Sequence, residues 1–575
     1  MFGYRGKILF INISSQSIEI ESTPSYFIKN YLGGRGFGVA FLRDKITLEY
    51  FDDAMPLIFA AGPLVATPSP TSGRFSVLSR SPLTGTIFDC SVGGRFGTIM
   101  KKAGFDAIVI TGKANKIIGI VIEDEKVSFV NSDDKQGLDT NEISKYFSKD
   151  YSVASIGLAG ERLVRFASIV FDGHYLAGRG GLGAVMGSKR LKFVAIKGTS
   201  KVDVKDLSLL KEAQEEIIRL LRASPALFGD FGISKYGTGA LVDLIHSRRL
   251  EPTENFKETF FKDSYKYDAY TISKQYNTRK TGCVGCPVLC KKKGSKGEII
   301  PEYESLSHFG ALNRCSDLSA IVEANRLCNI YGLDTISTAS TIACYSEIEG
   351  LRLSSEDIIT LIKEIACRDT KKGNALAEGS MRFAKMAGQP DKSMSVKSLE
   401  LPAYDPRGAY GMALAYAVSS RGGCHLRAYP ISYEILRKPV AVDRFSFEGK
   451  ARMVKLSEDL NAVIDSLTAC KFLFFSVTLE EYSKVLKAVT GLDYTVQDLM
   501  NIGDRICKLE RSLNNLNGFD IKDDTLPVRF FTEEGSSSEK IKIPPISKKD
   551  FSEALQRYYI VRGASVDGRI NKEIS

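Results

Sequence analysis

The segment Thr281-Gly282-Cys283-Val284-Gly285-Cys286-Pro287-Val288-Leu289-Cys290 carries three thiols in the order C-x2-C-x3-C. Gly282 and Gly285 let the backbone turn tightly and Pro287 stiffens the exit, so the three side chains can point into one hollow. A structural zinc site usually pairs two C-x2-C motifs, and this sequence has only one. The order is also the reverse of the C-x3-C-x2-C motif of radical-SAM enzymes. Three local cysteines with one distant cysteine are a common arrangement for a cubane iron–sulfur cluster, which the segment therefore predicts.

Length and composition are those of an ordinary globular protein. With 575 residues, the chain is long enough for about two to four domains. Its apolar share of 43% and its charged share of 25% are typical. No apolar run approaches the roughly 20 residues of a membrane-spanning helix, so no membrane association is expected. The net charge of +10 is spread over interleaved basic and acidic residues, which argues against nucleic acid as a partner.

Cysteine usage and the N-terminus indicate the compartment. Eleven cysteines, an odd number and mostly scattered, fit a reducing environment better than a disulfide framework. Residues 1–13 contain no long apolar stretch followed by a small-residue cleavage site, so no signal peptide is predicted. We therefore expect a cytoplasmic protein.

Residues 1–205 are predicted to be rich in β-strands. Apolar and other residues alternate over 9–13, and a serine-rich turn at 14–17 leads into a second strand at 18–20. Another hairpin is predicted from the apolar runs 117–122 and 127–130, which a charged turn separates. These patterns predict antiparallel pairing near the N-terminus.

Four glycine-rich segments, each with an arginine, connect the predicted strands. A single segment of this kind usually marks a turn. Four of them predict a large phosphate-bearing ligand, because bare backbone amides and guanidinium groups both bind phosphate. None opens a βαβ unit with an acidic residue at the required distance, so a Rossmann dinucleotide site is not predicted. The segments are 33–36, 72–74, 93–97 and 178–183.

Helical periodicity begins near residue 206. Asp206 is a candidate N-cap, and apolar residues recur at helical spacing from Leu210 to Leu221. The segment 525–549 is polar and contains prolines, so a surface excursion is predicted there. Domain boundaries are placed near 205 and 400. Further helices are predicted at 319–331, 355–367, 374–387, 444–466, 479–489 and 496–513.

Five further motifs accompany the three-cysteine segment. They are SPLTG at 81–85, AGRGGLGAVMGSK at 177–189, PEYE at 301–304, GLDTIS at 332–337 and DPRG at 405–408. Together the motifs resemble the tungsten-dependent aldehyde:ferredoxin oxidoreductases over nearly the whole chain. The resemblance implies an α+β fold, with a β-rich base domain at 1–205 for two pterin-dithiolene cofactors (molybdopterin). Two mostly helical domains, at 206–400 and 401–575, would close over it.

The resemblance also implies how the cofactors are bound. Four dithiolene sulfurs would hold tungsten, or molybdenum in its place, without a protein ligand. Cys283, Cys286 and Cys290 would bind a [4Fe-4S] cluster together with Cys470, which alone would be read as a core thiol. Carbonyl groups of Ser91 and Leu176 would bind a Mg²⁺ that bridges the pterin phosphates. The positions that match pterin contacts are Arg74, Ser91, Gly93, Leu176, Gly178, Arg179, Asn329, Leu333, Asp334, Arg421, Arg427 and Asp465.

Several positions depart from the family pattern. Tyr175 stands where an arginine commonly meets a pterin phosphate, Asn329 where an aspartate is usual, and Ser91 where an asparagine is common. Thr468-Ala469 replaces the usual Gly-Leu before the fourth cysteine. A tyrosine hydroxyl still donates a hydrogen bond, and an asparagine keeps one acceptor oxygen. We expect the cofactor to bind despite these changes.

Glu304 and His425 match the active-site glutamate and histidine of the family. The chain has only four histidines, and His425 follows two glycines that would leave its backbone bare. A carboxylate can take a proton from water, and an imidazole can polarise a carbonyl group or relay protons. The resemblance implies oxidation of a small-molecule aldehyde to the carboxylic acid, with water as the oxygen source. Electrons would pass through the [4Fe-4S] cluster to ferredoxin or a ferredoxin-like Fe–S subunit.

Two other functions stay open. The scaffold would also suit the catalytic subunit of a low-potential, dearomatising aryl-CoA reductase, which needs a larger pocket and further electron-supplying subunits. A non-catalytic electron-transfer subunit would keep the cysteines but lose the glycine–arginine segments and the Glu304–His425 pair. Because the chain has all of these features, we favour the enzyme.

Two places in the sequence are relevant to partner contacts. The run Lys291-Lys292-Lys293 directly follows the cysteines and is either a solvated turn or a docking face for an acidic ferredoxin. Some family members carry an iron between subunits, held by a glutamate and a histidine. Glu323 matches that glutamate, but no histidine lies between His308 and His425, so no such iron is predicted. A homodimer formed in another way stays open.

Overall fold

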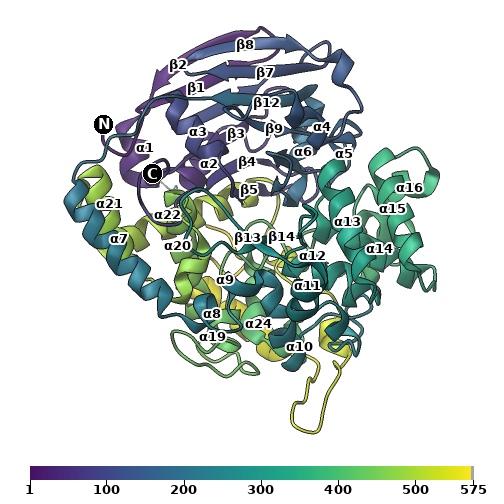
Figure 1. The fold of residues 1–575 in the computed structure, drawn as a ribbon. Helices are drawn as coiled ribbons and strands as arrows, with labels where there is room; N and C mark the ends of the chain where they lie inside the picture. The colour runs from purple at the N-terminus through teal and green to yellow at the C-terminus, as the bar shows by residue number, and fades with distance from the viewer. Residues whose placement is uncertain (571–575) are drawn as a thin grey trace.

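A computed structural model describes residues 1–570. β-Strands and short helices form the N-terminal part, at the top of Figure 1, and helices form most of the remaining chain. The predicted α+β fold class is therefore confirmed.

The first of two six-stranded sheets contains the N-terminal hairpin. Leu9 of β1 lies opposite Ile20 of β2 in an antiparallel pair, as the alternation at 9–13 predicts. β1 also pairs in parallel with β6, and this places β1 inside the sheet rather than at its edge. The strand order is β2 (Ser17–Ser22), β1 (Lys7–Asn12), β6 (Ala107–Thr111), β3 (Leu57–Ala60), β4 (Phe75–Arg80) and β5 (Ile87–Val92).

The second sheet contains the other predicted hairpin. Ile120 of β7 lies opposite Phe129 of β8, which confirms the pairing expected from 117–122 and 127–130. β7 also pairs in parallel with β12. The strand order is β11 (Tyr175–Ala177), β10 (Ile169–Phe171), β9 (Ser152–Ser155), β12 (Leu191–Lys197), β7 (Ile118–Glu123) and β8 (Lys126–Asn131).

Short helices fill the space around the two sheets. One of them corrects the sequence analysis, because the glycine-rich segment 33–36 is not a loop but the start of helix α2 (Gly34–Leu42). A side chain at Gly38 would lie 2.3 Å from the Leu78 side chain, so the glycine permits close packing of α2 on β4. The others are α1 (Ser25–Tyr31), α3 (Phe96–Ala103), α4 (Thr140–Lys145), α5 (Leu158–Glu161) and α6 (Leu182–Ser188).

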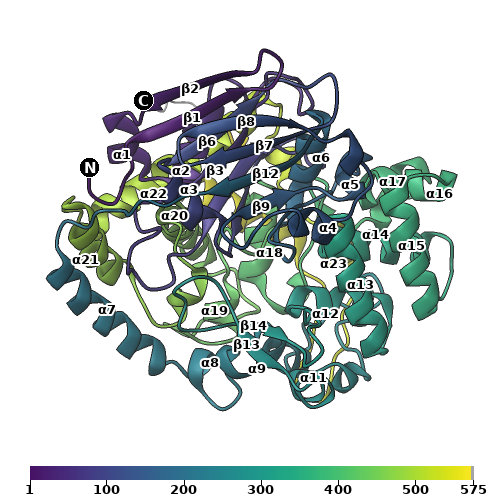
Figure 2. The same cartoon turned by 45° about the horizontal axis from the view of Figure 1, so that its top comes forward.

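Two groups of helices lie below the sheets, as Figures 1 and 2 show from different directions. In the first group, α7, α20, α21 and α22 lie on the side of the chain termini in Figure 1. This group consists of α7 (Leu207–Arg222), α18 (Tyr410–Val418), α20 (Lys450–Leu467), α21 (Leu479–Thr490), α22 (Val496–Leu516) and α24 (Lys548–Arg562). The other consists of α12 (Tyr303–Phe309), α13 (Leu318–Tyr331), α14 (Thr335–Ile348), α15 (Ser355–Cys367), α16 (Lys371–Leu376) and α17 (Ser380–Met386).

Short helices connect these groups, and strands β15 (Ser395–Val396) and β16 (Leu399–Glu400) form a small hairpin. The short helices are α8 (Pro225–Phe228), α9 (Ile233–Tyr236), α10 (Leu241–Ser247), α11 (Ala269–Tyr276), α19 (Ile431–Glu434) and α23 (Arg529–Thr532). Asp206 accepts a hydrogen bond from the Leu209 backbone and caps α7, as predicted.

Three sequence predictions need correction. The helix predicted at 374–387 is two helices, α16 and α17, separated near Gly379, whose φ of 88° does not continue a right-handed helix. The helix predicted at 444–466 begins only at Lys450, after Gly449 with φ of 71°. The segment predicted as a surface excursion at 525–549 is anchored, because Phe530, Ile543 and Ile546 are buried.

One apolar core extends through the described chain, from Tyr4 to Tyr559. The sheets and both groups of helices therefore share buried contacts, and the boundaries near 205 and 400 stay a prediction. Among residues 1–570, no helix combines the length and the apolar character that crossing a membrane requires.

Candidate functional site

A cavity of about 390 Å³ lies between the N-terminal sheets and the helices. It brings together every predicted site residue except Leu333 and Arg427, which are buried behind its wall. The predicted residues that line it are Arg74, Ser91, Gly93, Leu176, Gly178, Arg179, Cys283, Cys286, Cys290, Glu304, Asn329, Asp334, Arg421, His425, Asp465 and Cys470.

The four predicted cluster ligands line this cavity from two parts of the chain. β13 (Arg279–Thr281) and β14 (Lys291–Lys293) pair as a hairpin whose connection carries Cys283, Cys286 and Cys290. Cys470 follows α20, which Thr468 ends with a left-handed φ of 56°. The loop packs closely on the first sheet, since a side chain at Gly93 would lie 2.5 Å from the Cys283 sulfur.

Cys286, Cys290 and Cys470 are in an environment that disfavours free thiolates. Burial raises the pKa of Cys470 to about 11 and also raises the pKa of Cys286 and Cys290. Across residues 1–570, no group of three or more His, Cys, Asp or Glu side chains is arranged to hold a single metal ion. An iron–sulfur cluster is larger than one ion and would lie between its ligands, so its cysteines need not converge on one point.

The lysine run after the cysteines is not the exposed face that one reading of the sequence predicted. Lys291 lines the cavity, and its Nζ lies 3.3 Å from Glu302 Oε2. Lys292 is buried and donates to the Leu289 carbonyl oxygen at 2.8 Å. Lys291 and Lys292 therefore contact groups in and beside the cysteine loop instead of forming an exposed face.

Only two of the four glycine–arginine segments bring their arginine to the cavity. Arg74 lines the cavity and donates from Nε to Ser91 Oγ at 2.9 Å and from Nη2 to the Ser91 carbonyl oxygen at 2.6 Å. Arg35 is buried against Glu510 instead, and Arg95 donates to backbone oxygens at 149 and 151. The expectation that all four segments bind phosphate is therefore wrong for 33–36 and for the arginine of 93–97.

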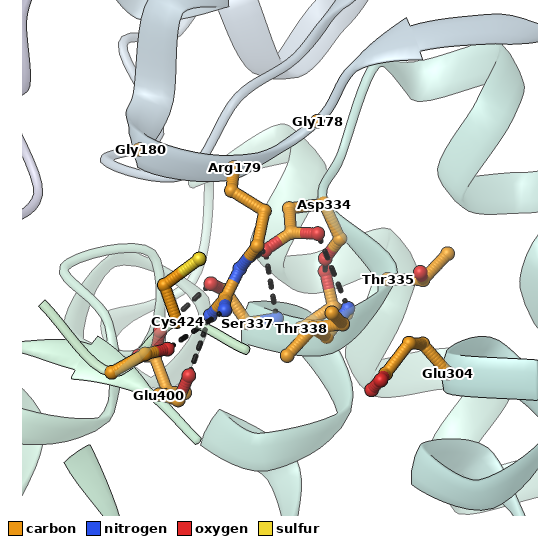
Figure 3. Close-up of polar contacts among 12 residues, drawn as sticks. Gly178, Arg179, Gly180, Glu304, Asp334, Thr335, Ser337, Thr338, Glu400 and Cys424 are labelled. Atoms are coloured by element: carbon orange, nitrogen blue, oxygen red, sulfur yellow. Dashed lines mark hydrogen bonds and ion pairs between the residues drawn. The ribbon is translucent and has the colours of Figure 1, made fainter. Parts of the chain in front are cut away.

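Arg179, the second of these arginines, connects three parts of the chain (Figure 3). Its Nε lies 3.3 Å from Asp334 Oδ2, and its Nη2 donates to the Glu400 carbonyl oxygen at 2.6 Å. Asp334 also caps α14 by accepting from the Ile336 and Ser337 backbone N–H groups. These contacts fix the position of the 178–183 segment relative to α14 and β16.

Glu304 and His425 face each other in the cavity, with Glu304 Oε1 lying 3.6 Å from His425 Nε2. Oε2 accepts from the Ala403 backbone N–H at 2.9 Å, whereas Oε1 has no hydrogen-bond partner among residues 1–570. Burial raises the pKa of Glu304 above its usual value. Burial, and next the charges of Arg179 and Arg421, keep the pKa of His425 well below its usual value. Burial therefore disfavours a charge on either group when that group is considered by itself.

Cys424 and Arg421 form a second polar unit in the cavity wall. Arg421 donates to Cys424 Sγ from Nε at 3.0 Å and from Nη2 at 2.9 Å. The Arg421 guanidinium lowers the pKa of Cys424 against the opposing effect of burial. This contact orients Arg421 toward the cavity.

Sequence reasoning missed two members, Asp89 and Lys471, of a buried network in the cavity wall. Arg427 contacts Asp89 through Nη2, and its Nη1 lies 3.9 Å from Asp465 Oδ2. Lys471 Nζ lies 2.8 Å from the same Asp465 oxygen. An acid within the otherwise buried strand β5 was a usable signal for Asp89, because a charge in such a strand requires a partner. The aromatic residues Tyr404, Tyr429, Phe472 and Phe474 also line the cavity.

Three further positions from the sequence analysis have defined contacts. The Tyr175 hydroxyl donates to the Gly282 carbonyl oxygen at 2.9 Å, so it binds the cysteine loop. The Asn329 carbonyl oxygen accepts from Thr140 Oγ1 at 3.0 Å, which ties α13 to the N-terminal part. Glu323 lies on the outer side of α13 and pairs with Arg326 at 2.7 Å.

Two family models match successive parts of the chain. A family model described as "Aldehyde ferredoxin oxidoreductase, N-terminal domain" matches residues 8–198. A second, described as "Aldehyde ferredoxin oxidoreductase, domains 2 & 3", matches residues 212–574. The chain belongs to the aldehyde ferredoxin oxidoreductase family. As a member of this family, it is an oxidoreductase.

Full-length relatives of this family are similar to the chain. It is 40% identical over 606 residues to the "Tungsten-containing aldehyde ferredoxin oxidoreductase" of Pyrococcus horikoshii, with 100% of this chain and 98% of the relative covered. The protein of the same name from Pyrococcus furiosus is 39% identical with the same coverage. A solved structure, "Active site complex BamBC of Benzoyl Coenzyme A reductase in complex with 1,5 Dienoyl-CoA", matches with a TM-score of 0.85. At 22% identity, covering 100% of this chain and 96% of that one, it shows a shared fold.

Proposed function

We propose that this oxidoreductase oxidises an aldehyde to the carboxylic acid at a tungstopterin centre, with a [4Fe-4S] cluster carrying the electrons away. The observation that carries the proposal is the cavity, where Glu304 and His425 lie opposite each other and four cysteines share the wall. The family and its tungsten-containing relatives support the choice of metal.

The lining residues fit these groups. Cys283, Cys286, Cys290 and Cys470 would bind the cluster. Arg74, Arg179 and Arg421 present guanidinium groups, which bind phosphates and other anions. Asp465 Oδ1 is buried without a hydrogen-bond partner among residues 1–570, and a pterin amine would supply one. A Mg²⁺ ion would lie against the backbone oxygens of Ser91 and Leu176. Ser91 already accepts from Arg74, and its carbonyl oxygen has a second lone pair for the ion.

When bound, the metal would accept two electrons and the cluster would pass them on one at a time. The oxidation of an aldehyde and water to an acid releases two electrons and two protons. Glu304 takes a proton from water at Oε1, the oxygen without a hydrogen-bond partner in the described chain. His425 Nδ1, also unpaired there, donates to the carbonyl oxygen of the aldehyde and polarises it. The protonated Glu304 can then donate from Oε1 to His425 Nε2.

We infer that electrons leave through the tip of the cysteine loop. Val284 at this tip is 48% exposed, and Gly285 is exposed beside it. Exposed basic residues surround the loop on the β13–β14 hairpin and the neighbouring helices α9 and α11. This charge suits an acidic ferredoxin or a ferredoxin-like subunit. The residues are Lys235, Lys274, Arg279, Lys280 and Lys296.

Metal analysis and an aldehyde panel test the proposal. Purified protein should contain about one tungsten and four irons per chain. It should reduce a viologen dye with aldehydes. Protein with full metal content that ignores every aldehyde but forms or consumes a dienoyl-CoA thioester would contradict aldehyde oxidation and favour an aryl-CoA reductase. Protein without tungsten and iron would contradict both.

A further inference from the structure

His308 has a buried imidazole ring, and the proposed reaction uses Glu304 and His425 but not this ring. His308 follows Glu304 by one helical turn on α12 and has 0% exposure. Its Nδ1 lies 2.7 Å from the Glu304 carbonyl oxygen, and its Nε2 lies 3.1 Å from the Leu401 carbonyl oxygen. Carbonyl oxygens only accept, and a neutral imidazole donates from one nitrogen alone. If His308 were neutral, one of the two carbonyl oxygens would face the lone pair of a ring nitrogen. A His308 imidazolium can donate a hydrogen bond to both carbonyl oxygens.

The carboxyl group of Glu304 provides the counter-charge. Its Oε2 lies 3.5 Å from His308 Nδ1 and accepts from the Ala403 backbone N–H at 2.9 Å. That N–H group favours the ionised carboxylate. A single buried charge would be lost by a change of protonation, but two opposite charges at this distance stabilise each other. Both His308 nitrogens and Glu304 Oε2 have hydrogen-bond partners, and Oε1 belongs to a residue that lines the cavity, where water can donate to it.

We propose that His308 is a positioning residue that keeps the active-site carboxyl ionised, so that the resting site holds His308 as imidazolium and Glu304 as carboxylate. The inference deepens the proposed function, because it explains how a buried carboxyl group is ready to accept a proton from water at Oε1. The pair remains neutral overall, and Glu304 does not have to release a proton first.

The surroundings act on both members of the pair. Burial is the largest effect and disfavours each charge separately: it raises the pKa of Glu304 and lowers the pKa of His308. Arg179 favours the carboxylate and disfavours the imidazolium, and Asp334 does the reverse. The tyrosines nearby have raised pKa values because they are buried, so they stay neutral. The remaining titratable and charged groups that face the pair are Tyr303, Glu400, Tyr404, Tyr416, Cys424, His425 and Tyr429.

The pH profile of a His308→Gln variant tests the inference. Glutamine can donate to a carbonyl oxygen but carries no charge. Removing a cation beside Glu304 raises the pKa of its carboxyl group, so the base form is lost at a higher pH. We expect the acid limb of the kcat/KM profile to move up by about one unit or more, which lowers the rate about tenfold on that limb and leaves the alkaline plateau nearly unchanged.

Infrared spectroscopy gives a readout that does not depend on turnover. At neutral pH, wild-type protein should lack a protonated-carboxyl band that Glu304→Gln removes. His308→Gln should show this band, and adding Glu304→Gln should remove it. A wild-type band that disappears in Glu304→Gln would overturn the inference, even if the His308 variant does not fold.

His246→Gln is the matched control, because His246 also contacts a glutamate, with Nδ1 2.8 Å from Glu251 Oε2, but does not line the cavity. Its profile should equal that of wild type. An unmoved profile in His308→Gln, or an equal shift in both variants, would refute the role of His308 and leave Glu304 as the base. If Glu304→Gln keeps the acid limb of wild type, Glu304 is not the base. That result would refute the proposed function instead.

Discussion

Arg35 of α2 and Glu510 of α22, separated by 475 residues in the sequence, form a buried ion pair with two contacts of 2.7 Å. Both side chains are almost fully buried, with 1% and 2% exposure. The pair joins the N-terminal part of the chain to the helix behind the cavity.

Replacing Arg35 by methionine should lower the free energy of unfolding by about 3–5 kcal/mol, because Glu510 would remain as a buried charge without its main partner. Urea unfolding measures this loss. Arg326→Met is the control, since Arg326 pairs with Glu323 at the same 2.7 Å on an exposed surface, where such pairs contribute about 1 kcal/mol or less. Equal losses in the two variants would show that burial does not determine the effect.

Glu304→Gln and His425→Asn should each lower turnover on the order of 10²–10⁴-fold, the usual loss when a positioned acid or base is removed. Tungsten and iron contents should not change, because neither residue is proposed to bind a metal. Glu302→Gln is the control: Glu302 is 47% exposed and pairs with Lys291, and its loss should leave the rate nearly unchanged. Variants that lose metal, yet keep the normal rate per bound tungsten, would show that Glu304 and His425 are structural instead.

Cys470→Ser should abolish or strongly reduce cluster binding, as should serine at Cys283, Cys286 or Cys290. Iron content and the EPR spectrum of the reduced protein report this. Cys367→Ser is the control, since Cys367 ends α15 and does not line the cavity. Full iron content with an unchanged spectrum in Cys470→Ser would remove Cys470 from the ligand set.

Electron transfer to ferredoxin should depend on Lys280 and the exposed basic residues around it. In Lys280→Gln, turnover with ferredoxin should fall more steeply than turnover with a viologen dye, because opposite charges speed encounter. Added salt should have the same selective effect. Lys116→Gln provides a control, as Lys116 is 73% exposed on the N-terminal part. Equal salt dependence with both acceptors would exclude this docking surface.

Local patterns predicted much of the fold. Partial alternation in β1, apolar runs in β7 and β8 and the polar turns after β1 and β7 identified both hairpins, and Asp206 marked the start of α7. Apolar periodicity did not predict elements in which the apolar residues lack a clear spacing. The helix α14 has apolar and small residues on all sides, so it lacks an amphipathic period and was not predicted.

The candidate site was predicted from motifs rather than from geometry. The cysteine spacing identified the loop, but nothing in the sequence shows that Arg35 turns to Glu510 or that Lys292 is buried. Such orientations depend on partners far away in the chain. The role proposed for His308 likewise became visible only when the Leu401 carbonyl was seen opposite its ring.

The cavity wall combines residues from early and late parts of the chain, such as Arg74 on the N-terminal side and Cys470 after α20. During synthesis, the first of these leaves the ribosome long before the second. A bulky cofactor would therefore meet only half of the cavity wall until the C-terminal helices dock, and the complete wall afterwards. Insertion of the proposed tungstopterin would then be a step of protein maturation, and a fully folded empty chain should take it up far more slowly than a nascent or partly unfolded one.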